Sequence, residues 1–261
     1  RKILGFKKLY DYDRYAPLEQ SKSVYKFKEC KKIVLETFAK FSPKFGEIAA
    51  RAFKEGWIDV YPTENKRGGA FSQSGVAKAH PYVLLNHTDE RRDLFTLAHE
   101  LGHAAHQNLA YESVGFLNAD TPLTTAETAS VFCEMLVFDH VKSTLKGKEK
   151  TALLAGKIED IFATLYRQIN FTTFERAVHA HEGEISLDEL NKIWLRESKK
   201  MFGKSVTLND YYKIWWSYIP HFIHTPFYCY AYSYAQLLVL ALFGLYKSGK
   251  CKNFVEIYTE F

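Results

Sequence analysis

The chain carries the stretch His99-Glu100-Leu101-Gly102-His103, in which two histidines stand four residues apart and a glutamate directly follows the first. On an α-helix, residues four apart lie on one face, one turn from each other. The two imidazoles can therefore point at one cation. Glu100 is too close to this pair to be a further ligand, but its carboxylate can reach a water molecule at the cation. The stretch predicts a helix that presents a metal site.

The residues around this stretch also predict a helix. No proline interrupts residues 82–121. An apolar stripe at spacings of three and four residues follows Asp93, as expected for one buried helix face: Leu94, Leu97, Ala98, Leu101 and Ala105. Gly102 costs about 1 kcal/mol relative to alanine in the middle of a helix. We interpret it as leaving room for a metal ion or a substrate backbone.

The pattern H-E-x-x-H on a helix is typical of zinc metallopeptidases, in which the glutamate acts as the base. The alternative is that His99 and His103 are ordinary histidines on a helix surface. The longer series H-E-x-x-H-x-x-G-x-x-H is excluded, because His106 and Leu109 stand where it needs glycine and histidine. We expect His106 to pack beside the site.

A catalytic zinc usually has three protein ligands and an open fourth position. The best third ligand is Glu127, in a segment that reads as a second helix with one buried face. Thr124-x-x-Glu127 also fits a capping box, in which Glu127 would only bond the start of its own helix. Glu127 follows His103 by 24 positions, which suits a helix, a loop and a second helix that folds back, and this favours the role of Glu127 as a ligand. Glu134, on the same face, is a candidate hydrogen-bond acceptor for the outer nitrogen of a ligand histidine.

Two sequence stretches carry a resemblance to a known family: T-L-A-H-E-L-G-H-A-A-H at 96–106 and A-E-T-A-S-V-F-C-E-M-L at 126–136. They resemble the M3 family of zinc oligopeptidases, and most closely its bacterial oligoendopeptidase F branch. The resemblance extends over most of residues 5–246. It includes the segments 9–18, 57–62, 66–72, 80–86, 219–221 and 226–234.

The resemblance implies a mainly α fold, in which long helices accompany a small antiparallel β-sheet beside the helix of the H-E-x-x-H motif. Members of the family are longer, and the chain begins at Arg1 and ends inside an unfinished pattern. We therefore expect residues 1–261 to be the zinc peptidase catalytic region of a longer chain, without its N-terminal helical region and with an incomplete C-terminus. The apolar periodicity predicts long helices over 20–55 and 141–204 and strands only within 57–87, with turns at Gly68-Gly69 and Gly75. Ser186-Leu187-Asp188-Glu189 predicts a helix cap.

The resemblance also assigns roles to residues. One Zn²⁺ would be held by His99, His103 and Glu127, and Glu100 would be the general base. His221 would contact substrate, and a tyrosine would donate a hydrogen bond to the oxyanion, with Tyr234 the best match. An edge strand near 69–75 would pair with an extended peptide. The expected substrate-binding residues are Gly68, Gly69, Ala70, Phe71, Tyr228, Tyr230 and Tyr232.

These residues predict a zinc-dependent endopeptidase that hydrolyses short unstructured peptides. Two alternatives remain open. A zinc carboxypeptidase would need a cationic anchor for a free carboxylate, for which Arg67 and Arg176 are candidates. A catalytically silent, zinc-stabilised helical module would need none of the substrate contacts.

The composition excludes other classes of protein. With 47% hydrophobic and 16% aromatic residues the chain is in the globular range. The net charge of +5 is mild, and the two lysine clusters at 26–32 and 142–150 lack interleaved aromatic residues, so no nucleic-acid partner is expected.

The cysteines and one uncharged stretch indicate the cellular location to expect for the protein. The four cysteines lack CxxC spacing, which favours free thiols in a reducing cytoplasm. Residues 225–246 carry no charge, but only Leu237 to Leu245 is aliphatic, about half of a membrane span. We therefore expect a tyrosine-rich loop followed by a buried helix, and no membrane partner.

Overall fold

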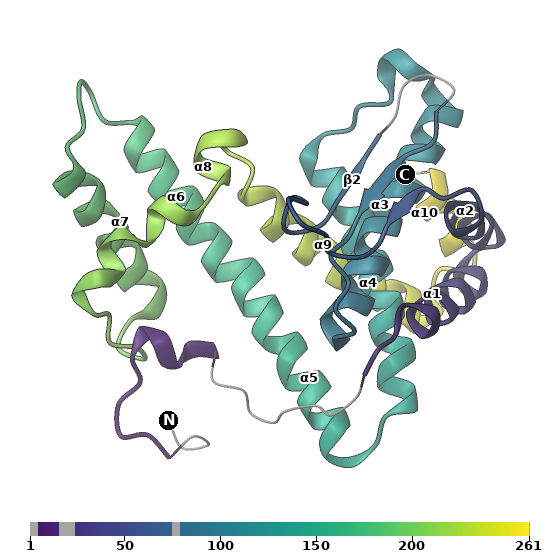
Figure 1. The fold of residues 1–261 in the computed structure, drawn as a ribbon, viewed down its shortest axis with the longest axis horizontal. Helices are drawn as coiled ribbons and strands as arrows, with labels where there is room; N and C mark the ends of the chain where they lie inside the picture. Colours follow the sequence, from purple (N-terminus) through teal and green to yellow (C-terminus); the bar gives the residue numbers. More distant parts are fainter. Residues whose placement is uncertain (1–4, 16–23, 75–78, 261) are drawn as a thin grey trace. The chain divides into compact units, whose positions relative to one another are not determined.

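The computed structural model describes residues 5–15, 24–74 and 79–260, and these residues are mainly α-helical (Figure 1). The chain divides into two compact units. The described parts of residues 22–146 and 237–261 form the first, which we call the sheet unit. The described parts of residues 1–21 and 147–236 form the second, which we call the helical unit. The expected turn at Gly75 and the segment Ala16-Pro17-Leu18 lie outside the described residues.

The first two helices of the sheet unit are α1 (Phe27–Phe41) and α2 (Pro43–Lys54). In the described part of 20–55, where long helices were predicted, the helical residues therefore form two separate helices. Ser42 between them has an extended backbone, with φ −149°. Pro43 lacks an N–H and suits the first position of a new helix, so the chain restarts there.

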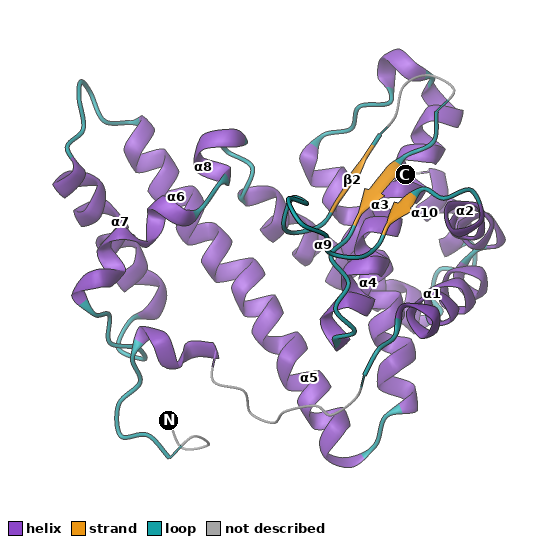
Figure 2. Ribbon diagram, in the orientation of Figure 1, coloured by secondary structure: helices purple, strands orange, loops and turns teal. Residues whose placement is uncertain are grey.

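The strands of the sheet unit lie within residues 57–87, as predicted (Figure 2). They are β1 (Ile58–Asp59), β2 (Phe71–Gln73) and β3 (Tyr82–Leu84). The order in the sheet is β1-β3-β2, so β2 is an edge strand. The sheet is mixed rather than wholly antiparallel, because β2 pairs antiparallel with β3 while β1 pairs parallel with the other side of β3.

Two long helices follow, α3 (Arg91–Val114) and α4 (Leu123–Thr144). A capping box begins α3: the Asp93 carboxylate accepts a hydrogen bond of 3.0 Å from the Glu90 amide. After α3 the chain turns at Gly115, which has φ +73°, and passes through the short 3₁₀ segment Phe116–Asn118 into α4. The predicted stripe of α3 is buried, which confirms the helix: Leu94, Leu97, Ala98, Leu101 and Ala105 are each at most 1% exposed.

Gly102 serves the packing of α3 against α4. A Cβ atom at Gly102 would lie 2.8 Å from the Ser130 Cα and 2.9 Å from the Cys133 Cβ of α4. The space beside Gly102 is therefore filled by the neighbouring helix, and the prediction that it leaves room for a metal ion or substrate was wrong. The glycine lets the two helices that carry the candidate metal ligands approach closely.

Replacing Gly102 with alanine is expected to lower the free energy of unfolding. Overpacking costs about 1–3 kcal/mol, which exceeds the gain of about 1 kcal/mol in helix propensity where the neighbours cannot move. Gly156→Ala is the matched control, because a Cβ there meets nothing within 4 Å and the same gain in propensity should raise stability. Urea unfolding measures both. Equal stabilisation by the two variants would contradict the packing role of Gly102.

The remaining helices of the sheet unit come from the end of the chain. They are the part of α9 (Tyr230–Ser248) after Gln236, and α10 (Phe254–Glu260). Phe132 of α4 stacks on Tyr258 of α10 with ring centroids 4.2 Å apart, so α10 completes an aromatic core. Among the described residues, no helix has the length and hydropathy that a membrane crossing needs. Three cysteines of the described chain are free and buried, as predicted: Cys30, Cys133 and Cys229.

Among the described residues, six helical elements of the helical unit lie between α4 and α9. They are α5 (Gly147–Phe162), the π-helical segment η3 (Ala163–Arg167), α6 (Gln168–His179), α7 (Leu187–Phe202) and the 3₁₀ segment η4 (Asp210–Tyr218), and the short α8 (His221–His224) follows. The long helices predicted over 141–204 are interrupted where the chain turns, at Gly147 and Gly183, which both have positive φ. The predicted cap at Ser186 is confirmed, with Ser186 and Glu189 forming a capping box at the start of α7.

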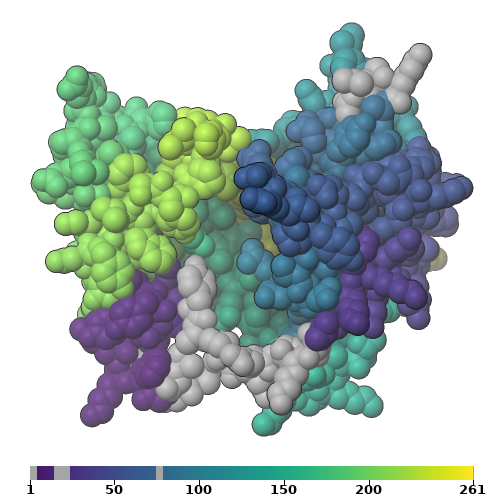
Figure 3. Space-filling view, in the orientation of Figure 1, coloured from purple at the N-terminus to yellow at the C-terminus, as the bar shows by residue number. Residues whose placement is uncertain are grey.

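A short N-terminal segment packs on the helical unit. The 3₁₀ turn η1 (Asp11–Tyr15) follows a bridge between Tyr10 and Thr207. The buried Asp11 carboxylate accepts hydrogen bonds from the backbone and side chain of Asn209. Figure 3 shows these N-terminal residues, in purple, lying against the green residues of the same unit.

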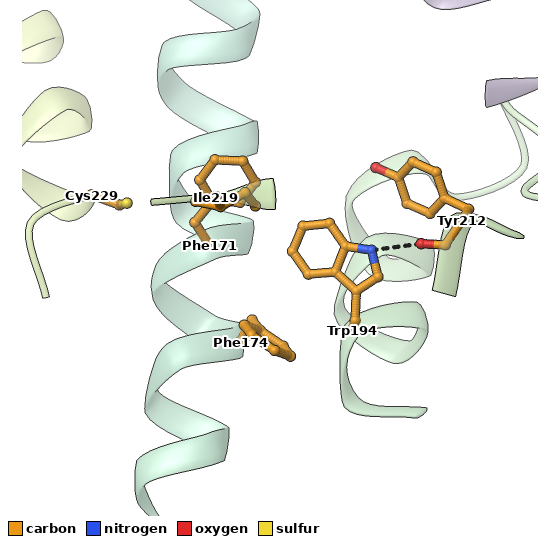
Figure 4. Close-up of a cluster of buried hydrophobic side chains, with 6 residues drawn as sticks. All are labelled: Phe171, Phe174, Trp194, Tyr212, Ile219 and Cys229. Carbon is orange, nitrogen blue, oxygen red and sulfur yellow. Dashed lines mark hydrogen bonds between the residues drawn. The ribbon is translucent and has the colours of Figure 1, made fainter. Parts of the chain in front are cut away.

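The core of the helical unit is aromatic (Figure 4). The indole of Trp194 in α7 donates a hydrogen bond of 3.0 Å to the Tyr212 carbonyl, which satisfies its polar atom inside the core. The cluster joins α6, α7, η4 and the segment before α9 through Phe171, Phe174, Trp194, Tyr212, Ile219 and Cys229. This core holds the ends of the segment that contains His221.

The tyrosines expected in a loop belong in part to a helix. Helix α9 begins at Tyr230, so Tyr230, Tyr232 and Tyr234 lie in its first turns, and only Tyr228 precedes it. The buried Ser233 hydroxyl donates to the Thr164 and Leu165 carbonyls of η3. The wider π-helical turn and the start of α9 are thereby tied together.

Candidate metal and catalytic site

Helices α3 and α4 bring three metal-binding side chains together in the sheet unit. The Nε2 atoms of His99 and His103 lie 3.5 Å and 3.8 Å from the same Glu127 Oε2 atom. One ligand atom from each of the three residues lies within 4.8 Å of the other two. The Glu127 side chain is only 3% exposed, whereas the two imidazoles keep a partly open side.

The capping alternative for Glu127 does not match the structure. Helix α4 begins at Leu123 after Pro122, so Thr124 is already inside the helix and is not its cap. The Glu127 carboxylate instead accepts a hydrogen bond of 3.2 Å from the Ser130 hydroxyl and faces the two histidines. A buried carboxylate in this position is costly unless a proton or a cation compensates its charge.

The pKa values of the two histidines are shifted in opposite directions. Burial by itself lowers the pKa of His99, but the hydrogen bonds with Glu127 and Glu134 outweigh it and raise that pKa well above the ordinary value. Burial lowers the pKa of His103 to about 4, and the charge of His99 adds to this effect. Metal binding requires both imidazoles to be neutral, so a cation would displace the proton that His99 shares with the two carboxylates.

Glu134 lies on the outer side of His99. Its Oε2 atom is 3.5 Å from His99 Nδ1, the nitrogen that faces away from Glu127. Such a contact fixes the tautomer and the ring orientation of a ligand histidine. Glu134 is therefore placed to act as an outer partner, a residue that binds a ligand histidine on the side away from the metal.

Glu100 is buried on α3, the helix that carries His99 and His103. Burial raises its pKa to about 7, with the charge of Glu127 adding to the rise and His99 and the Ser72 backbone opposing it. A carboxylate with a pKa close to neutral is well matched to general base catalysis. Its Oε2 atom is buried without a hydrogen-bond partner among the described residues. The site thus contains an acceptor beside the metal cluster.

The edge strand β2 is bound to α3 through Ser72. Gln107 Nε2 donates a hydrogen bond of 3.2 Å to the Ser72 carbonyl, and the Ser72 hydroxyl donates one of 2.9 Å to Gln107 Oε1. The Ser72 backbone N–H donates to the carboxyl of Glu100. Sequence reasoning missed this contact, although Gln107 follows His99 by eight residues and so lies near the same face of the helix.

The expected substrate-binding segment 68–71 leads into β2. Asn86 Nδ2 donates to the carbonyls of Arg67 and Gly69, and Gly69 has φ +84°. Gly69 and Ala70 line a cavity of about 310 Å³ together with Asn86, Arg92 and other residues at the start of α3. Gly68 and Phe71 are exposed.

The other expected substrate residues lie in the helical unit and separate into two groups. The His221 ring contacts Tyr228 and Tyr232, with ring centroids 5.7 Å and 5.9 Å away, and His221 Nε2 lies 3.4 Å from the Tyr232 hydroxyl. Tyr230 and Tyr234, four residues apart on α9, are 45% and 51% exposed. His221 therefore groups with Tyr228 and Tyr232 rather than with Tyr234.

The donor set of the metal cluster fits zinc. Two imidazole nitrogens and one carboxylate oxygen are a ligand set found in catalytic zinc sites, which keep a fourth position open. The ligand atoms converge without any rearrangement of α3 or α4. The buried charge of Glu127 would be compensated by the cation.

Comparisons with known proteins identify relatives of this chain. The chain is 32% identical over its whole length to an oligoendopeptidase F homolog of Borreliella burgdorferi, and 30% identical to oligopeptidase PepF of Bacillus subtilis. It covers 45% and 39% of those two proteins, so it spans less than half of their length.

Solved structures share the fold. A crystal structure from Chlamydophila abortus, of a protein assigned as a peptidase, superposes with a TM-score of 0.78 at 30% identity, over 99% of this chain and 44% of that one. PZ peptidase A with a bound inhibitor shares the fold at 18% identity, with a TM-score of 0.78 over all of this chain and 47% of that one. The predicted fold class, mainly helical with a small sheet, is thus confirmed. The model of peptidase family M3 matches residues 1–261, and the chain therefore belongs to that family.

Proposed function

We propose that this chain is the catalytic region of a zinc-dependent endopeptidase that hydrolyses short unstructured peptides. The observation that carries the proposal is the convergence of His99, His103 and Glu127 within 4.8 Å, one helical residue away from the buried Glu100. Membership of peptidase family M3 and the oligoendopeptidase F names of the relatives support the substrate class.

His99, His103 and Glu127 would hold one zinc ion. When bound, zinc supplies Lewis-acid chemistry, since it polarises a carbonyl oxygen and makes water more acidic. Glu134 keeps the His99 ring in the orientation that directs Nε2 to the cluster. The close packing of α3 on α4 at Gly102 maintains the spacing of the ligands.

Glu100 would act as the general base. Its carboxylate removes a proton from the attacking water and then transfers that proton to the leaving amine. The Ser72 amide holds one carboxylate oxygen, which leaves the unpartnered Oε2 to accept the proton. Because Ser72 belongs to β2, this bond connects the base to the edge strand.

An extended peptide would add to the sheet at β2. In the register of the sheet, Ser72 is opposite Val83. The Val83 amide points toward β1, because it donates a hydrogen bond to the Trp57 carbonyl beside that strand. Ser72 and Val83 are therefore not hydrogen-bonded to each other, and the backbone N–H and C=O of Ser72 face away from β3. Both groups already bond α3 side chains. Alternate residues of a strand face the same edge, so the peptide would pair beside Ala70 rather than at Ser72. Main-chain pairing implies a loose preference for peptide sequence.

Two further roles fall on residues of the helical unit. By resemblance, His221 contacts substrate and a tyrosine stabilises the oxyanion. Tyr234 stays our assignment for this tyrosine, because its hydroxyl-bearing ring is half exposed at the start of α9. Tyr232 is engaged with His221.

Tyr234→Phe is expected to lower kcat by about 100-fold with little change in KM, because the hydrogen bond is made only in the transition state. Tyr211→Phe is the matched control, since Tyr211 belongs to the same unit, has a similar exposure of 48% and has no expected role in the site. Steady-state kinetics on the full-length protein separate kcat from KM. Full activity of Tyr234→Phe with a loss in Tyr228→Phe or Tyr232→Phe would transfer the role to the His221 group.

The alternative functions have less support. The candidate carboxylate anchors Arg67 and Arg176 are both exposed, and Arg67 lies over the Phe71 ring at 5.7 Å. Neither arginine belongs to the buried metal cluster. A silent helical module would not require the buried base Glu100.

One assay tests the proposed function. The full-length protein, loaded with zinc, is given an internally quenched peptide of about ten residues with blocked termini, because a carboxypeptidase needs a free carboxylate. Cleavage inside the peptide that stops with a chelator and returns with zinc is the expected result. Cleavage only of peptides with a free C-terminus would support the carboxypeptidase, and zinc binding without cleavage would support the silent module.

A further inference from the structure

The segment between α8 and α9 contains a turn with a strained residue. The Tyr228 amide donates 3.3 Å to the Thr225 carbonyl, with Pro226 in the second position of the turn and Phe227 in the third. Phe227 has φ +59°. This arrangement is that of a type II turn, in which the third position favours glycine. The other non-glycine residues with positive φ in the described chain are Asn65 and Asp89, whose short polar side chains tolerate this conformation better.

A buried carboxylate holds this turn. In a β-turn the amide of the third residue takes no part in the closing hydrogen bond and needs another acceptor. Glu175 Oε1, from α6, accepts a hydrogen bond of 2.7 Å from the Phe227 amide. Glu175 is only 2% exposed, and its Oε2 atom has no hydrogen-bond partner among the described residues. The charged acceptor makes this bond stronger than a neutral one.

The turn sets the relation between His221 and the tyrosines. On one side, the Thr225 amide donates 3.1 Å to the His221 carbonyl at the start of α8. On the other side, Tyr228 packs on the His221 ring, and Cys229 is fixed in the aromatic core near Phe171 (Figure 4). A change in the backbone at Phe227 would therefore move Tyr228 relative to His221.

Two features that disfavour folding lie together at the contact between Glu175 and Phe227. A buried carboxylate oxygen without a partner disfavours folding, and so does positive φ at a phenylalanine. The Phe227 side chain is 40% exposed and packs on the His179 ring of α6 with ring centroids 4.8 Å apart, so the contacts of the ring offset only part of the strain. Strain that collects beside candidate functional residues is typical of a site whose geometry the fold must enforce.

We propose that Glu175 is a positioning residue for the peptidase reaction: by binding the Phe227 amide it enforces the turn that places Tyr228 against His221. The proposal rests on the proposed function, because it assumes that His221 contacts substrate. Glu175 itself touches no substrate and acts through the turn.

The first test replaces Glu175 in the full-length protein. Glu175→Ala is expected to lower kcat by about 10- to 100-fold, as misplacement of substrate-contacting groups does. Zinc content should stay near one per chain, since the metal cluster is in the sheet unit. Glu175→Gln keeps an oxygen that can accept the hydrogen bond from the Phe227 amide, so its kcat should be much closer to that of the wild-type protein than the kcat of Glu175→Ala.

The second test restores the turn without the carboxylate. Glycine adopts positive φ without strain, so adding Phe227→Gly to Glu175→Ala should recover part of the activity. Phe227→Ala in the same background removes the same ring but keeps the strain, and should recover none. A difference between the glycine and alanine double variants identifies the backbone as the cause.

Two readouts exclude a merely structural role. Glu197→Gln changes another buried carboxylate of the helical unit, on α7, which binds Arg196 and Lys200. It should lower the unfolding temperature without lowering the kcat of the folded protein. The NMR signals of the His221 ring, which the neighbouring tyrosine rings shift, should change in Glu175→Ala and return with Phe227→Gly.

The NMR readout also separates this proposal from the proposed function. If the wild-type protein cleaves no peptide, the function fails, whereas the His221 signals still test the positioning. Unchanged kcat and unchanged His221 signals in Glu175→Ala would overturn the proposal. A lower unfolding temperature as the sole effect would also overturn it.

Discussion

Glu100→Gln is expected to lower kcat/KM for an internally quenched peptide by about 10²- to 10⁴-fold, the range that general base catalysis contributes. Glutamine has nearly the same size and can still accept the hydrogen bond from the Ser72 backbone. It cannot take a proton from water. Because Glu100 is not among the three residues that converge on the metal position, zinc content should remain near one per chain.

Kinetics and metal analysis of the same preparation decide this prediction. Glu36→Gln, on the exposed surface of α1, is a suitable control, because it makes the same chemical change away from the site. Loss of zinc in Glu100→Gln would mean that Glu100 holds the metal site together. Undiminished cleavage with zinc retained would remove Glu100 as the base.

Glu127→Ala is expected to weaken zinc binding by more than the roughly 10- to 100-fold typical of outer partners, because it removes a ligand and the buried negative charge together. Competition with a chelating dye measures the affinity directly. Peptide cleavage should fall in parallel at zinc concentrations that saturate the wild-type protein.

Glu134→Gln is the matched control for Glu127→Ala, since both glutamates belong to α4 and both lie 3.5 Å from a nitrogen of His99. As an outer partner, Glu134 should have the smaller effect. If Glu134→Gln weakens zinc binding more than Glu127→Ala, the two glutamates have exchanged roles, and His99 binds the metal through Nδ1.

The metal helices could be predicted from the sequence because several signals agree there. The apolar stripe of α3, the spacing of His99 and His103, and the distance to Glu127 all describe two packed helices. The capping box at Ser186 is equally local, since two side chains three residues apart determine it. Local consistency of this kind is what makes a prediction reliable.

Other features depend on contacts that a local pattern does not encode. The need for a small residue at Gly102 was visible, but its cause is Ser130 on another helix. The parallel pairing of β1 with β3 joins strands that are short and separated by β2 in the chain. Helix α9 starts earlier than expected because Ser233 bonds the carbonyls of η3, a tertiary contact.

The candidate site shows the same division. His99, Glu100 and His103 share one short pattern on α3, and Glu127 follows at a distance along the chain that suits a second, packed helix. The sequence was therefore sufficient to bring these residues together. Gln107 could have been found from its helical position relative to His99. The bond from Glu175 to Phe227 could not, because the two residues are 52 positions apart and positive φ at phenylalanine contradicts its local preference.

The most direct test of the account is a crystal structure of the zinc-loaded protein with data collected on both sides of the zinc absorption edge. We predict one anomalous peak, about 2.0–2.2 Å from an imidazole nitrogen of His99, an imidazole nitrogen of His103 and a carboxylate oxygen of Glu127, with Glu100 outside the coordination sphere. A peak bound by Glu100, or zinc held by residues other than these three, would contradict it.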